Sequence, residues 1–275
     1  MATATRRIRL RQPRLWQRVS TLMWARRALW LLIVALVWAM FRHSVSGASA
    51  VVGVILLLVL QKALRVWEQS LRRQFVRDAA LPNYLIDKLI AAYPQLNQGD
   101  ADLVMRGLRQ FFMAYVRSGG QFVGMPSKVV DTAWHEFILH TQAYQLWCDS
   151  AFGKLLHHTP AEVMRGNDTQ RNDGLRRTWY WACKEESIDP RNPSRLPLLF
   201  ALDRKFGIEG GYRYEANCKP IQDAGNSNTY CGGDFSSTDS GASGDSGGFG
   251  GSESSSGSDG GGDGGSDGGG GCGGD

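Results

Sequence analysis

The feature that most constrains this chain is a pair of apolar runs near its start, Ala28 to Phe41 and Val51 to Leu60, joined by the polar linker Arg42 to Gly47. Fourteen helical residues cover about 21 Å, which is less than the ~30 Å of bilayer hydrocarbon. Each helix must therefore include flanking residues such as Arg42 and Lys62, whose long side chains reach the interface. We predict a transmembrane helical hairpin.

Basic residues flank both ends of this hairpin. Eight arginines precede the first run, and five bases follow the second: Lys62, Arg65, Arg72, Arg73 and Arg77. Because such flanks stay in the cytoplasm, we expect an inner or plasma membrane protein, N-in and C-in, with a cytoplasmic soluble domain. The alternatives are a signal peptide cleaved at Ala48-Ser49-Ala50 or an organelle transit peptide. The long basic arm and the second apolar run favour the hairpin.

Charge is distributed unevenly along the chain. Residues 1–67 hold eleven bases and no acid, residues 68–231 hold twenty bases and eighteen acids, and residues 232–275 hold eight acids and no base. The basic excess lies beside the apolar runs, so we expect the lipid bilayer as its partner and no nucleic acid. The predicted organisation is a basic arm (1–27), a two-helix membrane anchor (28–67), a helical domain (68–231) and a disordered Gly/Ser/Asp tail (232–275).

The last 44 residues contain twenty glycines and eleven serines. Such a composition cannot bury enough apolar surface to offset the entropy of ordering the backbone, so we predict disorder. Asp259, Asp263 and Asp267 recur every four residues, but a calcium-binding repeat needs a large apolar residue in each turn, and none follows Phe249. The tail suits a tether, a solubilising segment or a weak contact for basic surfaces.

Between anchor and tail the pattern predicts an all-α fold, a compact bundle of five or six helices. Capping residues, glycines and prolines mark the expected boundaries. We expect helices from Pro82 to Tyr93, from an N-cap at Asp100 to Gly119-Gly120, from Ser127 to about Ser150, from Thr159-Pro160, from Asp173, and from Ser194 or Leu196 with Pro197 to Gly207. A short strand is allowed at Gly211 to Glu215.

Four of the five histidines and the first cysteine fall between Met125 and Pro160. His135 and His140 resemble a zinc-protease pair with one residue too many, and at i and i+5 they diverge by about 140° around a helix. Asp131 and His135, at i and i+4, share one face. An Asp beneath a His can fix the tautomer of a histidine that binds metal or moves a proton. A local Asp–His hydrogen bond near a helix N-terminus is the alternative.

A second row, His140, Tyr144 and Cys148, lies roughly opposite Asp131. On one straight helix His135 and Cys148 would be about 20 Å apart and could not share an ion. Two arrangements remain for zinc: Cys148 with the histidines that follow Gly153, or a loop that returns one of those histidines to Asp131 and His135. The candidate site is Asp131, Trp134, His135, His140 and Tyr144. The candidate metal ligands, which would not all bind the same ion, are His135, His157, His158 and Cys148.

Aromatic and cysteine residues in this region have more ordinary roles as well. Trp134, Phe137, Tyr144 and Trp147 recur at helical spacing, which is typical of a packed core. The five cysteines are odd in number and widely spaced, without a C-x-x-C pair. We therefore predict neither a disulfide scaffold nor a zinc ribbon, and expect mostly buried thiols.

The order Val-Val-Asp131-x-x-Trp134-His135, followed by Tyr144, Cys148, Gly153 and His157-His158, resembles the signature of the glycine-rich domain-containing protein-like family. The resemblance covers mainly residues 80–220 and implies a helical block combined with a glycine-rich tail. Plant and fungal relatives read W-H-x-H. This chain has Phe137 in place of the second histidine, and His140 is the nearest substitute.

Three functional hypotheses follow from these patterns. The chain has no complete nucleophile, acid or phosphate-binding motif, which favours a membrane-anchored interaction module with a protein partner and a metal site. A zinc-dependent hydrolase or metal-binding protein using Asp131, His135 and His157 or His158 is the second hypothesis. An envelope or transport accessory protein, in which the hairpin itself is functional, is the third. The sequence identifies no small-molecule substrate.

Overall fold

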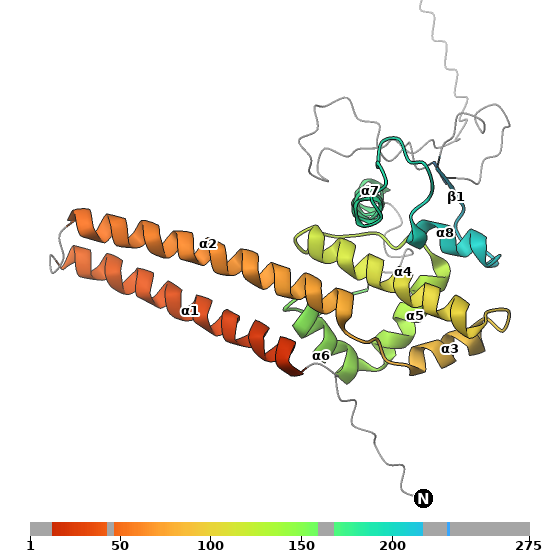
Figure 1. Cartoon of the computed structure of the whole chain (residues 1–275), viewed down its shortest axis with the longest axis horizontal. Coiled ribbons are helices and arrows are strands. Elements are labelled where there is room, and N and C mark those ends of the chain that lie inside the picture. Colours follow the sequence, from red (N-terminus) through yellow and green to blue (C-terminus); the bar gives the residue numbers. More distant parts are fainter. Residues whose placement is uncertain (1–12, 43–46, 159–167, 217–229, 232–275) are drawn as a thin grey trace, which may run out of the picture.

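The computed structural model describes residues 13–42, 47–158, 168–216 and 230–231. Over these ranges the chain forms eight helices and one pair of two-residue strands (Figure 1). The elements are α1 (Pro13–Phe41), α2 (Gly47–Asp78), α3 (Tyr84–Ala92), α4 (Gln98–Arg117), α5 (Lys128–Leu139), α6 (Thr141–Ala151), α7 (Asp168–Glu185), α8 (Leu198–Lys205), β1 (Tyr214–Glu215) and β2 (Tyr230–Cys231). The predicted all-α class is confirmed, while the tail at 232–275 lies outside the described residues.

Helices α1 and α2 pack side by side as a hairpin that projects from one side of the helical domain (Figure 1). Each is long and apolar enough to cross a membrane. Only 17% of the apolar window of α1 and 11% of that of α2 is buried, so neither behaves as a core helix of a soluble domain. The hairpin architecture predicted from the two apolar runs is therefore confirmed.

Helix α2 does not stop at the predicted end of the anchor, residue 67. It continues without a break to Asp78, and its last turns bury Leu71, Phe75 and Val76 in the core of the domain. No glycine or proline follows Gly53 in this helix, so nothing in its sequence ends it earlier. One helix thus belongs to both the anchor and the domain.

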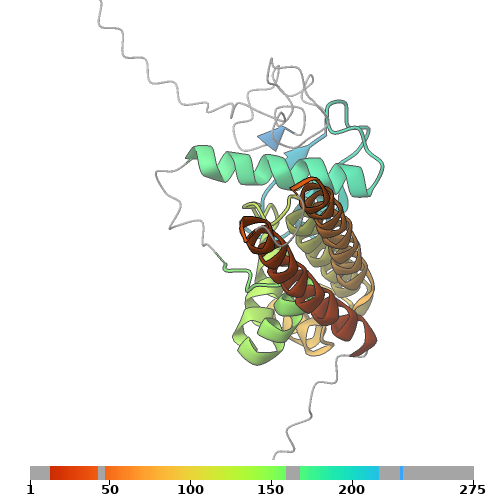
Figure 2. The ribbon, with the colours of Figure 1, turned by 90° about the vertical axis from the view of Figure 1, so that its left-hand side faces the viewer.

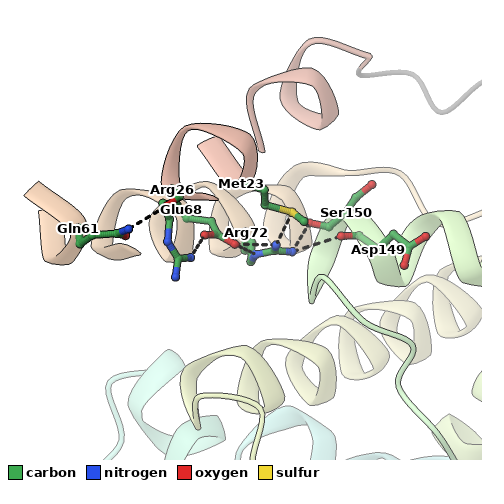
Figure 3. A network of polar contacts seen from close by, with 7 residues as sticks. All are labelled: Met23, Arg26, Gln61, Glu68, Arg72, Asp149 and Ser150. Atoms are coloured by element: carbon green, nitrogen blue, oxygen red, sulfur yellow. Dashed lines mark hydrogen bonds and ion pairs between the residues drawn. The ribbon is translucent and has the colours of Figure 1, made fainter. Parts of the chain in front are cut away.

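A polar network ties the hairpin to the domain where the two meet (Figure 3). Glu68 accepts hydrogen bonds from Nε and Nη2 of Arg72 at 3.0 and 2.7 Å, and it also pairs with Arg26 of α1. Arg72 Nη1 donates to the carbonyl oxygens of Asp149 and Ser150, each at 3.2 Å. Arg72 therefore binds the C-terminal end of α6 from α2, where it adds a side-chain donor to the last carbonyls of the helix.

Helix α4 is the central element of the domain and contacts α2, α3, α5, α7 and α8. Asn97 is its N-cap, and Asp100 completes a capping box, so the prediction that Asp100 itself is the cap was three residues late. The helix ends at Arg117, before Gly119 and Gly120, which both have positive φ. These glycines were predicted to end it, because positive φ suits a residue without Cβ.

The central helix predicted from Ser127 to about Ser150 is instead two helices, α5 and α6, separated at His140. The reason lies in packing. Trp134 and Trp147 both pack against Phe112, the first edge-on and the second tilted, with ring centroids 6.2 and 4.6 Å away. On a straight helix they would lie about 20 Å apart along the axis. The bend at His140, with φ −90° and ψ 62°, brings both indoles to the same phenyl ring.

The remaining elements of the domain are α7, α8 and the two short strands. Helix α7 lies across the hairpin direction, as Figure 2 shows, and begins at Asp168 rather than at the predicted Asp173. Pro197 directly precedes α8, as expected. The predicted strand near Gly211 is the two-residue β1, paired in parallel with β2. The helix predicted from Thr159-Pro160 lies outside the described residues.

One buried carboxylate, Asp203 of α8, holds the start of α5. Its Oδ1 accepts from Ser127 Oγ at 2.7 Å and from the Val129 amide at 3.1 Å, while Oδ2 accepts from the amides of Lys128 and Tyr212 at 2.7 and 2.9 Å. Ser127 Oγ in turn accepts from the Val130 amide, which is the predicted N-cap bond. The charge also suits the positive end of the α5 dipole.

We predict that Asp203→Asn lowers the free energy of unfolding by about 2–3 kcal/mol, because the amide NH₂ cannot accept the hydrogen bonds that one carboxylate oxygen now accepts. Urea unfolding of the full chain in detergent micelles, followed by circular dichroism, measures the change. Glu209→Gln, at an exposed neighbouring position, is the control and is expected to change stability by less than about 0.5 kcal/mol. Equal stability of the two variants would contradict this role of Asp203.

Candidate functional site

Three candidate ligands from the sequence, Asp131, His135 and His158, come together at the surface of the domain. Asp131 Oδ1 lies 3.0 Å from His158 Nε2, and Oδ2 lies 3.5 Å from His135 Nδ1. The two imidazole rings are 4.2 Å apart between centroids. One ligand atom from each residue falls within 4.8 Å of the others. We call these residues the Asp131 cluster.

Helix α5 supplies two members of the cluster. Asp131 lies in its first turn and His135 one turn later, so the i, i+4 spacing places both on one face. The position of this turn depends on Ser127 and Asp203, which bind the free amides at the start of the helix. The two donors are therefore held by a helix whose N-terminus is fixed from another element.

His158 reaches the cluster through the segment that follows α6. The Trp134 indole donates to Tyr144 Oη at 3.1 Å, and Tyr144 Oη donates to the Leu156 carbonyl at 2.5 Å. The His158 ring then packs edge-on against Trp134, with centroids 4.7 Å apart. Burial raises the pKa of Tyr144 above its ordinary value, so its hydroxyl stays protonated and available as a donor. Trp134 and Tyr144 thus position His158.

The other predicted ligands lie elsewhere. His140, at the bend between α5 and α6, stacks on Tyr84 at 3.9 Å and donates from Nδ1 to the Glu136 carbonyl at 3.1 Å. It is therefore not part of a row with Tyr144 and Cys148, because the helix breaks there. His157 is exposed and outside the cluster. Cys148 is fully buried and also outside the cluster.

The cluster is asymmetric in its exposure. The His158 side chain is 14% exposed and the Asp131 side chain 29%, whereas the His135 side chain is 50% exposed. One side of the three donors is therefore packed against Trp134, and the other is open to water. Two imidazole nitrogens and a carboxylate oxygen are donors that zinc accepts, and three protein ligands leave a position for water.

Some contributors to this geometry carry no local sequence signal. Asp203 is 76 residues from Ser127 in the chain, and Arg72, which binds the end of α6, is 77 residues from Asp149. Neither pairing shows as a periodicity or a motif. The sequence holds one hint of the role of Asp203. It is an acid among the apolar residues of LLFALDRK, and an acid on the buried face of a helix is expected to have a partner.

The sequence of residues 71–235 matches the family described as UCP032817-like, and this is more than half of the 275-residue chain. The chain belongs to the UCP032817-like family. The matched region contains the whole Asp131 cluster and begins at Leu71 within α2, after both apolar runs. No curated protein and no solved structure matches the chain. The resemblance to the glycine-rich domain-containing protein-like family stays a prediction.

The UCP032817-like region also contains the buried thiols Cys148 and Cys183. Burial raises the pKa of Cys148 from 9.0 to about 11 and that of Cys183 from 9.0 to about 12. Both thiols therefore keep their protons in the folded protein at neutral pH. Their contribution to stability is complete below pH 9 and is lost as the pH rises towards 11 and 12, because the unfolded thiols ionise first.

We predict that iodoacetamide at about pH 8 leaves Cys148 and Cys183 unmodified in the folded protein, with rates at least about 100-fold below those in urea, since the thiolate is the reactive form. Peptide mass spectrometry after timed quenching measures the two rates. The same protein in urea is the control, where both thiols should react fully. Rapid labelling of Cys148 without denaturant would contradict its assignment as an inert core thiol.

Proposed function

We propose that this chain is a membrane-anchored metal-binding domain, in which Asp131, His135 and His158 bind one divalent transition-metal ion. The observation that carries the proposal is the convergence of these three donors from α5 and the segment after α6. The interaction-module hypothesis is compatible with this function, since a bound ion can stabilise the surface that a protein partner contacts.

The donor spacing supports a single ion. Ligands about 2.0–2.1 Å from a tetrahedral zinc ion lie about 3.4 Å from each other. The two distances from the Asp131 oxygens, 3.0 and 3.5 Å, lie on either side of this value. Small side-chain rotations therefore suffice to exchange the direct Asp–His contacts for bonds to an ion.

The surroundings support the same conclusion. The Asp131 cluster rests on a rigid helix and on a loop fixed by the Trp134–Tyr144–Leu156 chain of hydrogen bonds, and outer groups of this kind orient metal ligands. Two histidines and one carboxylate also suit Fe(II), but zinc stands above iron in general affinity for such sites. We therefore name zinc as the ion.

A zinc-dependent hydrolase is the second candidate, and the exposure of His135 favours it. Catalytic zinc sites use three protein ligands and keep a water in the fourth position, where the ion lowers the pKa of that water. Half of the His135 side chain is exposed, so a substrate can approach the open side of the cluster. This candidate requires the ion and fails if the cluster binds none.

We predict that the full chain, purified in detergent and incubated with equimolar Zn²⁺ and Fe²⁺ under anaerobic conditions, retains about one zinc ion per chain. His135→Ala and His158→Ala remove a ligand and should weaken binding by more than about 100-fold, beyond the loss typical of outer-shell changes. Elemental mass spectrometry after gel filtration measures the metal content, and competition with a chromophoric chelator measures the affinity.

Matched controls are His140→Ala and His157→Ala, which remove histidines of the same region that lie outside the cluster. Both variants should keep full zinc content. A wild-type chain that retains no metal would overturn the metal proposal and with it the hydrolase. Equal loss in all four variants would indicate general histidine binding rather than this site.

We also propose that both ends of the hairpin face the cytoplasm, so that the domain with the Asp131 cluster is cytoplasmic in an inner or plasma membrane. The support is the arginine and lysine content on both sides of the two apolar helices. The exposed Trp24 and Trp67 suit the membrane interface on that side.

We predict that green fluorescent protein fused after Asp275 fluoresces, whereas alkaline phosphatase at the same position is inactive, because phosphatase folds only outside the cytoplasm. A fusion after His43, which retains only the first apolar run, is the matched control and should show the opposite pattern. Phosphatase activity after Asp275 would refute the orientation and would leave the metal proposal untouched.

A further inference from the structure

A groove of about 560 Å³ lies on the domain between the end of α2, the middle of α4, the end of α7 and the start of α8. It is separate from the Asp131 cluster and shares no residue with it. Half of its lining is apolar, including Leu103, Met113 and Leu196. Its charged lining is dominated by four arginines: Arg77, Arg106, Arg109 and Arg195.

The two acidic residues that line the groove, Glu185 and Glu186, already have partners within the domain. Glu185 binds Arg117 at 2.6 Å, and Arg117 is not part of the lining. Glu186 accepts from the Leu198 amide at 2.6 Å and from Gln110 Nε2 at 2.8 Å, and it also pairs with Arg195. The Glu186 carboxylate therefore has hydrogen bonds from neighbouring groups, and the Glu185 carboxylate forms its short ion pair with an arginine outside the groove, so the charge of each acid is largely balanced without Arg106 and Arg109.

Three guanidinium groups remain with weak or uncharged partners. Arg109 Nη1 donates to the carbonyl oxygens of Val76 and Arg77 at 3.0 and 3.3 Å, and burial lowers its pKa despite the nearby Asp78. Arg77 is 4.0 Å from Glu185. Arg106 is exposed and has no carboxylate partner within the ranges that the structure describes. A groove of this kind fits an anion that also carries an apolar group.

We propose that the occupant of this groove is the acidic tail of the same chain, with segment 245–253 as its anchor. This segment reads DSGGFGGSE and places one phenyl ring, Phe249, between the carboxylates of Asp245 and Glu253. The phenyl ring packs on the apolar lining, and the carboxylates pair with Arg106 and its neighbours. Residues 232–275 hold eight acids and no base, so the whole tail complements the groove in charge.

The connection of the chain supports an intramolecular contact. The tail follows β2, which pairs with β1, and Tyr214 of β1 packs on Phe200 of α8 at 4.9 Å between ring centroids. Leu198 and Ala201 of the same helix line the groove. Helix α8 is about 12 Å long. The start of the tail therefore lies away from the groove by about the length of α8, which is about 12 Å.

The reach of the tail is sufficient for this distance. Phe249 is 18 positions beyond Cys231, and a Gly/Ser-rich chain of that length has a root-mean-square span of about 23 Å. A tether of this kind gives an effective concentration in the millimolar range. A contact that is weak between separate molecules therefore becomes largely occupied within one chain. An acidic protein partner would have to displace the tail to use the same arginines.

Photo-crosslinking of the full chain in detergent tests this proposal. Benzoylphenylalanine at position 102, one helical turn before Arg106 on α4, should cross-link to peptides from segment 245–253 at about 0.05 M salt. Cleavage at acidic residues and mass spectrometry locate the cross-link. At about 0.5 M salt the yield should fall at least about fivefold, since screening shortens the range of the charges. The same probe at Leu139, exposed on α5, is the control and should not capture the tail.

Three substitutions distinguish anchoring by Phe249 from general charge attraction between the tail and the groove. Phe249→Ser should lower the cross-link yield at position 102 at least about fivefold, whereas Phe235→Ser should leave it unchanged. Arg106→Glu should lower it similarly, with an unaltered thermal melt as the check on folding. Cross-links spread evenly over the tail would overturn the anchor. Cross-links between two chains, with a yield that falls on dilution, would overturn the intramolecular contact. An unchanged cross-link pattern in Phe249→Ser, together with loss of all cross-links in inorganic phosphate, would show that the groove binds anions without the anchor and would also overturn it.

Discussion

The four hydrogen bonds to the Asp203 carboxylate fix where α5 begins, and the rest of the site depends on that starting point. A helix N-terminus leaves its first amides without internal partners, and here a side chain from α8 accepts two of them while it holds Ser127 and Tyr212. The same helix also packs against α4, where Gly107 leaves room for Leu202. A shift of α5 by one residue would turn Asp131 and His135 away from His158.

Local signals in the sequence predicted much of this fold because they act within a few residues. The apolar runs gave the hairpin, Ser127 gave the start of α5, and Gly119-Gly120 gave the end of α4. The bend at His140 was missed because no glycine or proline marks it. It arises from two indoles that meet one phenyl ring on α4, and this is tertiary packing that no window of the sequence contains.

The candidate site was likewise predictable where local helix geometry determines it, and not where tertiary contacts do. Asp131 and His135 could be paired from their i, i+4 spacing alone, since helix geometry places them on one face. The choice among His157, His158 and Cys148 could not be made, because it depends on the path of the chain after α6. That path is set by Arg72 from α2 at the end of α6 and by Tyr144 at Leu156. Both are contacts between residues far apart or on different faces, and the sequence order does not reveal them.

The unbroken course of α2 from the hairpin into the core has a mechanical consequence. The eighteen residues from 61 to 78 follow the end of the second apolar run, Leu60, and as a helix they form a rod about 27 Å long. The Arg26–Glu68–Arg72 contacts brace this rod against α1 and α6. The domain therefore cannot swivel as it would on a flexible linker. A change in bilayer thickness can change the tilt of such a hairpin. A tilt change of about 10° would move the Asp78 end of this rod, and the domain attached to it, sideways by about 5 Å.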